Sequence, residues 1–348
     1  MKKIIDALDI LLENECERQR NQFVGYASAT STDPSAIPVI DAAALGGGDI
    51  DAIVHASRAL VEAAERVGFF YVRNHGVPDS LVERVFSLSR RFFALPADAK
   101  QSVRINALHR GFLAIGDARM YDEARVDLKE SFIWGPELGL DDPDVAAGKP
   151  LMGPNQWPAA LPELGPALTA YSAAVMDCAR TLLRGFAVSL GLDVDFFRER
   201  FAKPLARCSL IYYPPQPPES GREQFGVAPH TDYGGLTLLN QDDTGGLQVR
   251  TRAGEWVIAP PIPGTFVVNI GDLMARWTND RFVSTPHRVV NSSGRARYSV
   301  GVFFDPAFDT VIDPAELRPG CPSLYPPVTC GSYIVSRLNK AFSYRRRG

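Results

Sequence analysis

His230 and Asp232 stand two positions apart in a stretch that runs into apolar residues. In an extended strand, residues i and i+2 face the same side. The imidazole and the carboxylate are therefore predicted to point at one place. Two histidines and one carboxylate on one face of a metal leave coordination positions open, and oxygen-activating non-haem Fe(II) sites use this arrangement. The pair predicts an iron site that needs one more nitrogen ligand.

The third ligand is expected from a distant strand. The chain has five histidines, and His287 is the one that shares the β-rich half of the sequence with His230. The chain between Asp232 and His287 is long enough for several strands to cross a barrel and return, which suits a closed sheet lined from opposite walls. We predict His230, Asp232 and His287 as the metal ligands and the catalytic centre. The alternative for His287 is an ordinary strand histidine hydrogen-bonded to a neighbour.

A second chemical feature is the alternating segment from Arg297 to Phe304. Alternation places Arg297, Ser299 and Phe303 on one face of a strand. An arginine that points into a barrel requires an anionic partner, because a buried unpaired charge is costly, and its planar fork matches a carboxylate. Ser299 would donate to the same group. The alternative for Arg297 is a surface salt bridge.

The elements that must position these residues can be outlined from hydrophobic patterning. From about residue 206, short apolar runs alternate with turn signals, which is typical of a β-sandwich or jelly roll. Strands are predicted there at 208–213, 235–241, 247–251, 265–270, 283–290 and 297–304, with a turn at Gly271-Asp272. Earlier in the chain, a strand is predicted at 37–41, an aromatic strand that ends in a turn at 67–77, a strand or bend at 127–135, and helices at 50–66, 80–93 and 164–190. The predicted fold class is α+β with a mainly β core: a double-stranded β-helix (jelly roll) with flanking helices and an α/β N-terminal region.

Composition indicates an ordinary globular protein, with 348 residues, 45% hydrophobic and 22% charged. The net charge of −3 gives no electrostatic reason to expect nucleic acid or an anionic membrane as a partner. No stretch approaches the roughly 20 apolar residues of a membrane span. Acidic residues interrupt the apolar positions near the N-terminus, so an amphipathic helix is expected there rather than a signal peptide. Five cysteines without a CxxC pair predict reduced thiols and a cytoplasmic location.

Taken together, the sequence resembles the isopenicillin N synthase-like branch of the Fe(II)- and 2-oxoglutarate-dependent dioxygenases. The resemblance is carried by residues 37–41, 68–77, 127–135, 229–249, 269–272, 287–290 and 297–299. It implies that His-x-Asp and the distal His bind iron, and that Arg-x-Ser binds the far carboxylate of 2-oxoglutarate. Tyr213, directly before Pro214, is implied to support the same carboxylate.

The implied activity is hydroxylation or desaturation of a small organic substrate by Fe(II), 2-oxoglutarate and O2, with release of succinate and CO2. Two alternatives stay open. One is a relative that shares Arg-x-Ser but oxidises its substrate without 2-oxoglutarate, and the other is a non-catalytic cupin-like metal-binding protein. The expected organisation has five parts: an N-terminal helix and linker (1–36), an N-terminal non-haem dioxygenase region (37–160), a long helix and connection (161–205), the jelly-roll core (206–310) and a C-terminal segment (311–348).

Substrate specificity is expected from variable loops on a fixed scaffold. The candidate substrate residues are Arg110, Arg119 and Tyr121 in one loop and Phe303 near the end of the last core strand. An ordinary surface or packing role is the alternative for each.

Overall fold

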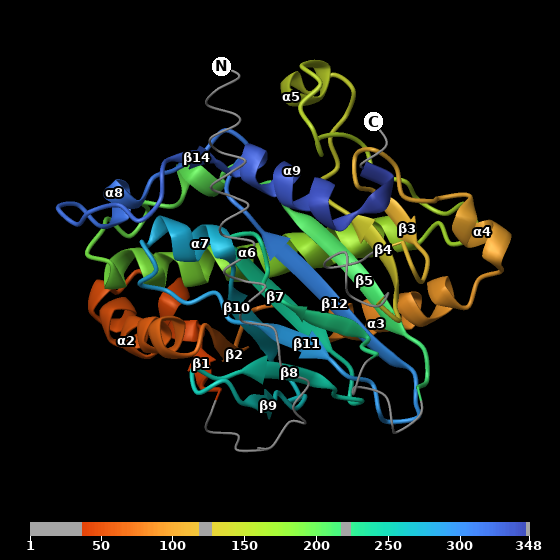
Figure 1. The fold of residues 1–348 in the computed structure, drawn as a ribbon, viewed down its shortest axis with the longest axis horizontal. Helices are drawn as coiled ribbons and strands as arrows, with labels where there is room; N and C mark the ends of the chain where they lie inside the picture. Colours follow the sequence, from red (N-terminus) through yellow and green to blue (C-terminus); the bar gives the residue numbers. More distant parts are fainter. Residues whose placement is uncertain (1–36, 118–126, 217–223, 346–348) are drawn as a thin grey trace.

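The computed structural model describes residues 37–117, 127–216 and 224–345. Its main strands form two sheets that face each other across a shared apolar layer (Figure 1). The large sheet has the strand order β1 (Val39–Asp41), β2 (Phe69–Arg73), β10 (Phe266–Ile270), β7 (Leu236–Gln241), β12 (Arg297–Phe304), β5 (Arg207–Tyr213), β4 (Glu130–Trp134) and β3 (Gly111–Leu113). The small sheet has the order β6 (Val227–His230), β11 (His287–Val289), β8 (Leu247–Arg250) and β9 (Trp256–Ile258).

Helices cover the outer face of the large sheet. The long helix α6 (Leu164–Ser189) packs against α2 (Ile50–Arg66), α3 (Asp79–Phe93) and β12. The helix predicted at 164–190 is α6, and its apolar face is buried and forms one core with the outer face of the sheet. The remaining elements are shorter: α4 (Ala97–Gln101), α5 (Pro143–Ala146), α7 (Asp272–Trp277), α8 (Pro314–Leu317), α9 (Cys330–Ala341), the strand pair β13 (Val311–Ile312) and β14 (Val328–Thr329), and the 3-10 turns η2 (Ala43–Gly46), η3 (Glu199–Phe201) and η4 (Ser343–Arg345).

The strands of the N-terminal region do not form a layer of their own. The parallel pair β1 and β2 extends one edge of the large sheet, and β3 and β4 extend the other. Within the described residues the strands form open facing sheets rather than one closed barrel. The jelly-roll fold class is thus confirmed, whereas the expected barrel closure is wrong.

Local patterning predicted several elements closely. The predicted helix at 50–66 is α2, whose N-terminus is capped by Asp49 through the backbone N–H groups of Asp51 and Ala52. The predicted strand at 297–304 is β12. The aromatic strand predicted within 67–77 is β2, and the turn predicted at its end is where Asn74 and Gly76 adopt positive φ. The amphipathic helix and linker expected before residue 37 lie outside the described residues.

Two predictions in the core are wrong. The strand expected at 283–290 is reduced to β11, since side chains hold the preceding segment against other parts of the chain. Ser284 donates to Asp272 Oδ1 (2.7 Å), and Thr285 donates to the carbonyl of Val67 (2.6 Å). The turn expected at Gly271-Asp272 is instead the start of α7. None of the described helices combines the length and apolar character that a bilayer crossing requires.

Candidate active site

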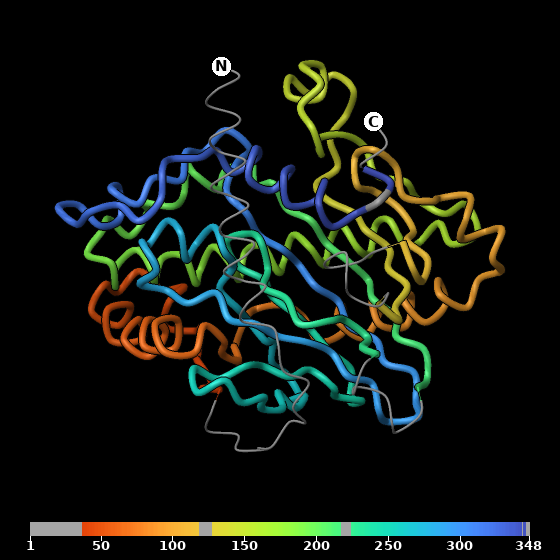
Figure 2. The backbone as a smooth tube through the Cα atoms, in the orientation of Figure 1, coloured from red at the N-terminus to blue at the C-terminus, as the bar shows by residue number. Residues whose placement is uncertain are grey.

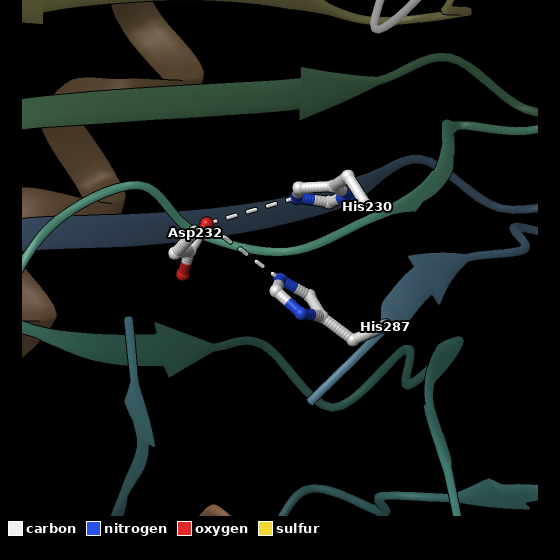
Figure 3. Close-up of side chains that lie close together, drawn as sticks. All are labelled: His230, Asp232 and His287. Carbon is white, nitrogen blue, oxygen red and sulfur yellow. Dashed lines mark ion pairs between the residues drawn. The ribbon is translucent and has the colours of Figure 1, made fainter. Parts of the chain in front are cut away.

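The side chains of His230, Asp232 and His287 converge at the inner face of the small sheet (Figure 3). His230 ends β6 and His287 begins β11, and the two residues are direct partners in the antiparallel pairing of these strands. Asp232 Oδ1 lies 3.8 Å from Nε2 of His230 and 3.8 Å from Nε2 of His287. One ligand atom from each residue lies within 4.8 Å of the other two.

Asp232 does not lie on the same strand as His230, which corrects the expected arrangement. β6 ends at His230, and Asp232 sits in the turn that leads to β7. The backbone N–H of Asp272 at the start of α7 donates to the carbonyl of Asp232 (2.7 Å) and fixes this turn. The two side chains therefore meet because a tertiary contact holds the turn, and alternation along a strand is not the cause.

Both imidazoles are oriented by backbone carbonyls. Nδ1 of His230 lies 2.8 Å from the carbonyl of Ala228, and Nδ1 of His287 lies 3.2 Å from the carbonyl of Thr285. A carbonyl oxygen only accepts, so Nδ1 carries the proton in each ring. Nε2 is left with a free lone pair that points toward Asp232. This is the tautomer that a metal-binding histidine requires.

Asp232 is held in a similar way through its other oxygen. Oδ2 accepts from Thr237 Oγ1 (2.6 Å) and from Asn269 Nδ2 (2.8 Å), so Oδ1 is the atom presented to the histidines. Burial alone would raise the pKa of Asp232, but the facing rings of His287 and His230 and the two hydrogen bonds bring it below its usual value. Burial, assisted by the neighbouring His287, lowers the pKa of His230. The site therefore favours a neutral His230 imidazole beside an ionised Asp232 carboxylate.

These residues fit a divalent metal ion such as iron. The donor set is two imidazole nitrogens and one carboxylate oxygen, and all three residues line the same cavity. Such a set leaves the opposite side of a metal open for other ligands, as in non-haem Fe(II) oxygenases. The hydrogen bonds behind each ligand atom fix its direction before a metal arrives.

A fully buried arginine lies at one end of the same cavity. Arg297 donates through Nε to the carbonyl of Gly245 (2.5 Å), through Nη1 to Ser299 Oγ (3.2 Å) and through Nη2 to Gln241 Oε1 (3.1 Å). The ring of Tyr213 lies 4.7 Å from its guanidinium carbon. Within the described part of the chain, no carboxylate lies within ion-pairing distance of Arg297. A buried cation that has only neutral partners is matched to an anionic ligand.

The cavity between the two sheets has a volume of about 160 Å³. Its walls include the three converging side chains, Arg297 and Tyr213. The strand register places Arg207 and Phe303 at the other end of β5 and β12, away from Arg297 and Tyr213, whereas Lys129 lies just before β4, next to Tyr213. His109, Leu338 and Phe342 also line the cavity. Two of these residues come from the C-terminal segment, which lies beside the chain around residue 110 (Figure 2). Arg345 donates to the carbonyl of Ala107 (2.8 Å) and Tyr344 hydrogen-bonds His109, which keeps this segment against the cavity.

The structure separates the four residues predicted to bind substrate. Phe303 lines the cavity. Arg110 does not. It is buried at 1% exposure, and it donates to the carbonyls of Leu151 (3.0 Å) and His109 (3.3 Å), which is a structural role. Arg119 and Tyr121 lie outside the described residues.

Several residues at the cavity were not singled out from the sequence: Thr237, Gln241 and Asn269 behind the functional side chains, Lys129 near Tyr213, and Arg207 with its partner Asp305 at the other end of β5 and β12. One of them had a sequence signal. On a strand that presents Tyr213 to the cavity, period-two alternation also presents Arg207, six residues earlier in the chain. The others depend on contacts between distant segments.

A sandwich of two sheets, a converging His, Asp and His set and a buried arginine at the end of one cavity define a class of protein: a metal-dependent oxygenase built on a jelly roll. Comparison with known proteins supports this class. Residues 37–160 match the family model described as non-haem dioxygenase in morphine synthesis N-terminal. Residues 206–306 match the model of the 2OG-Fe(II) oxygenase superfamily.

Individual relatives are similar in sequence over nearly the whole chain. A homoarginine-6-hydroxylase of Oryza sativa subsp. japonica is 37% identical and covers 88% of this chain and 98% of its own length. The 2-oxoglutarate-Fe(II) type oxidoreductase hxnY of Emericella nidulans is 36% identical, and the match covers 89% of this chain and 91% of that protein. Among solved structures, a full-length Neurospora crassa protein in complex with alpha-KG and thymine is similar with a TM-score of 0.78 at 30% identity, covering 89% of this chain and 99% of that one.

The chain belongs to the 2-oxoglutarate-Fe(II) oxygenase superfamily. It is an oxidoreductase of the dioxygenase type, and the family uses Fe(II), 2-oxoglutarate and O2. The expected activity and cofactors are thereby confirmed.

Proposed function

We propose that His230, Asp232 and His287 are the Fe(II) ligands of this dioxygenase and form its catalytic centre. The observation that carries the proposal is the convergence of two Nε2 lone pairs and one carboxylate oxygen, each fixed by a hydrogen bond on its far side. When bound there, Fe(II) would couple the oxidative decarboxylation of 2-oxoglutarate by O2 to oxidation of a substrate C–H bond, giving succinate and CO2.

We further propose that Arg297, Ser299 and Tyr213 bind the far carboxylate of 2-oxoglutarate. Arg297 supplies the charge, and its guanidinium is held in place by Gly245 and Gln241. The Ser299 hydroxyl accepts from Arg297 Nη1, so its own proton is free to donate to a ligand oxygen. Tyr213 covers one face of the guanidinium. These residues orient the co-substrate and exclude water from its charged end, because all three are buried.

The finer classification is also a proposal. We assign the chain to the isopenicillin N synthase-like branch on its His-x-Asp, distal His and Arg-x-Ser pattern and on the tyrosine before Pro214. A cytoplasmic location is supported by the described cysteines, all unpaired: Cys178, Cys208, Cys321 and Cys330.

The substrate is proposed to be a small molecule, since the cavity is small and the C-terminal segment forms part of its wall. Named ligands of the relatives differ in charge: homoarginine for the hydroxylase of Oryza sativa, and thymine in the structure of the Neurospora crassa protein. Either compound is a rational first test.

The test of the proposed function is an anaerobic titration of 2-oxoglutarate into the Fe(II) protein, followed by an aerobic assay of succinate release over a metabolite panel. We expect a visible charge-transfer band on titration and succinate release that requires 2-oxoglutarate. If the protein consumes O2 with a substrate but shows neither the band nor succinate, Arg297 does not bind 2-oxoglutarate, and the proposed co-substrate site is wrong.

A further inference from the structure

Arg207 is a second buried arginine of the cavity, and its hydrogen-bonding capacity is largely unused. It begins β5, and its side chain is 8% exposed. Its single hydrogen bond to the described residues runs from Nη2 to Asp305 Oδ2 (2.7 Å). Nε is sealed from solvent and has no hydrogen-bond partner among the described residues. Nη1 has no hydrogen bond to the described residues either, but it is not a sealed atom, and Arg207 lines the cavity. Guanidinium donors are rarely left unpaired in a protein interior, which indicates that a ligand completes the set.

The charge of Arg207 is already balanced. Asp305 is fully buried, and besides the bond to Arg207 it accepts from the backbone N–H of Gly235 (2.9 Å). Lys129, which lines the cavity nearer to Tyr213, is balanced too, because its Nζ lies 3.3 Å from Asp127 Oδ2. Apart from Arg297, the described arginine and lysine side chains that line the cavity are therefore paired with carboxylates. An anionic ligand beside Arg207 would have to share the guanidinium with the buried carboxylate of Asp305.

The surroundings of Arg207 are apolar and partly aromatic. The guanidinium carbon lies 5.4 Å from the centre of the Phe303 ring, and Ile133, Leu338 and Phe342 line the same cavity. Such walls favour a flat or compact apolar body with few polar groups. A neutral carbonyl oxygen can accept from a paired guanidinium without adding charge to this environment.

We propose that Arg207 binds the primary substrate, and that the substrate is a small uncharged molecule that presents a carbonyl oxygen to this side chain. The class includes cyclic amides and imides. The inference rests on the proposed function, since it assumes that 2-oxoglutarate occupies the Arg297 end of the cavity. It adds a specificity-determining residue and a substrate class to that function.

A purely structural role is the rival explanation. Arg207 and Asp305 join the start of β5 to the end of β12, and Asp305 also holds the turn at Gly235. A structural ion pair would affect stability, but it would not make the protein distinguish ligands by their charge. The test must therefore measure ligand selectivity.

The experiment is calorimetric titration of the full chain loaded with Mn(II) and 2-oxoglutarate, which prevents turnover. The probes are thymine, which is neutral and carries carbonyl groups, and orotate, which carries a carboxylate on a similar ring. For the unmodified protein we expect thymine to bind at least about tenfold more tightly than orotate. Equal or tighter binding of orotate, or no measurable binding of thymine, would overturn the proposal.

Two variants sharpen the result. Asp305→Asn leaves the charge of Arg207 unpaired, so the ratio of the two affinities should shift toward orotate by at least about tenfold. Arg207→Leu combined with Asp305→Asn removes the pair without leaving a buried charge, and should weaken thymine binding by about tenfold or more. Unchanged affinities in both variants would identify the pair as structural and refute the proposal.

A matched control is available outside the cavity lining. Glu316 pairs with Arg200 and also accepts from Trp277 Nε1 (3.0 Å), so it resembles Asp305 in bonding one arginine and one further N–H group. Glu316→Gln should leave the ratio of thymine to orotate affinity unchanged. Titration of 2-oxoglutarate in the same instrument tests the proposed function separately from the role of Arg207. If 2-oxoglutarate binds but the probes do not discriminate, only the role of Arg207 fails, whereas loss of 2-oxoglutarate binding contradicts the proposed function.

Discussion

The two ends of the cavity each hold a buried arginine, but the two side chains have opposite surroundings. Arg297 makes three hydrogen bonds to neutral groups and has no carboxylate partner among the described residues. Arg207 makes one hydrogen bond, and its partner is the buried carboxylate of Asp305. The first guanidinium is rigidly oriented and electrically unbalanced, and the second is balanced but has unused donors. Burial of an arginine thus does not define its ligand, because the groups already paired with it decide whether a charge or a neutral acceptor is missing.

The largest effect is expected from the residues between the two ends. His230→Ala, Asp232→Ala or His287→Ala should each abolish turnover and iron binding while the circular dichroism spectrum stays unchanged, because each removes one of three protein ligands. Iron content and succinate release are measured on the same samples. A variant that keeps turnover near the level of the unmodified protein would exclude that residue as a ligand.

Arg297→Leu should have the next largest effect, and it should be confined to one end of the cavity. It would leave the far carboxylate of 2-oxoglutarate buried and unpaired, a loss of about 2–5 kcal/mol, which corresponds to a fall in affinity of tens to thousands of times. Arg297→Lys should restore only part of the affinity, since an ammonium group cannot reproduce the planar fork. The measurement is the anaerobic 2-oxoglutarate titration. If Arg207→Leu lowered the affinity for 2-oxoglutarate as much as Arg297→Leu does, the two arginines would not have the separate roles proposed for them.

Removing the support of Asp232 should have an intermediate effect. Thr237→Val keeps the shape of the side chain but deletes the hydrogen bond to Oδ2. Loss of such a bond behind a metal ligand typically costs about 10–100-fold in metal affinity or activity. Iron affinity is measured by competition with a chelator. Thr237→Ser, which keeps the hydroxyl, is the control, and an equal loss in both variants would assign the effect to packing.

The smallest predicted effect concerns His109, which lines the same cavity. Burial, together with the nearby Arg207, Arg110 and Arg345, lowers the pKa of His109 well below the usual 6.5. The folded state therefore excludes a proton that the unfolded state binds, so stability should fall as the pH decreases below about 6.5. His109→Gln should reduce this acid-induced loss by about 2–4 °C in the melting temperature of the metal-free protein. Parallel melting curves for the two proteins between pH 7 and pH 5 would contradict the assignment.

Local sequence patterns determined a large part of this protein. Helical periodicity predicted α2 and α6, and period-two alternation predicted β12 together with the common face of Arg297 and Ser299. These features depend on residues a few positions apart, and near-neighbour geometry is fixed by the helix or strand itself. The spacing of His230 and Asp232 also indicated a metal site, although the two residues are joined by a turn rather than by one strand.

Tertiary structure alone decided the features that depend on distant segments. The 283–290 segment is mostly irregular because Ser284 and Thr285 bond to Asp272 and Val67, and no pattern within the segment indicates those partners. Asp232 is aimed by Asn269, and Arg207 is neutralised by Asp305, nearly a hundred residues later in the chain. A side chain's charge and donors can be read from its residue type, but whether they are already satisfied depends on the fold. For that reason the sequence predicted a buried arginine that binds an anion, and only the structure distinguished it from a second buried arginine whose charge is paired.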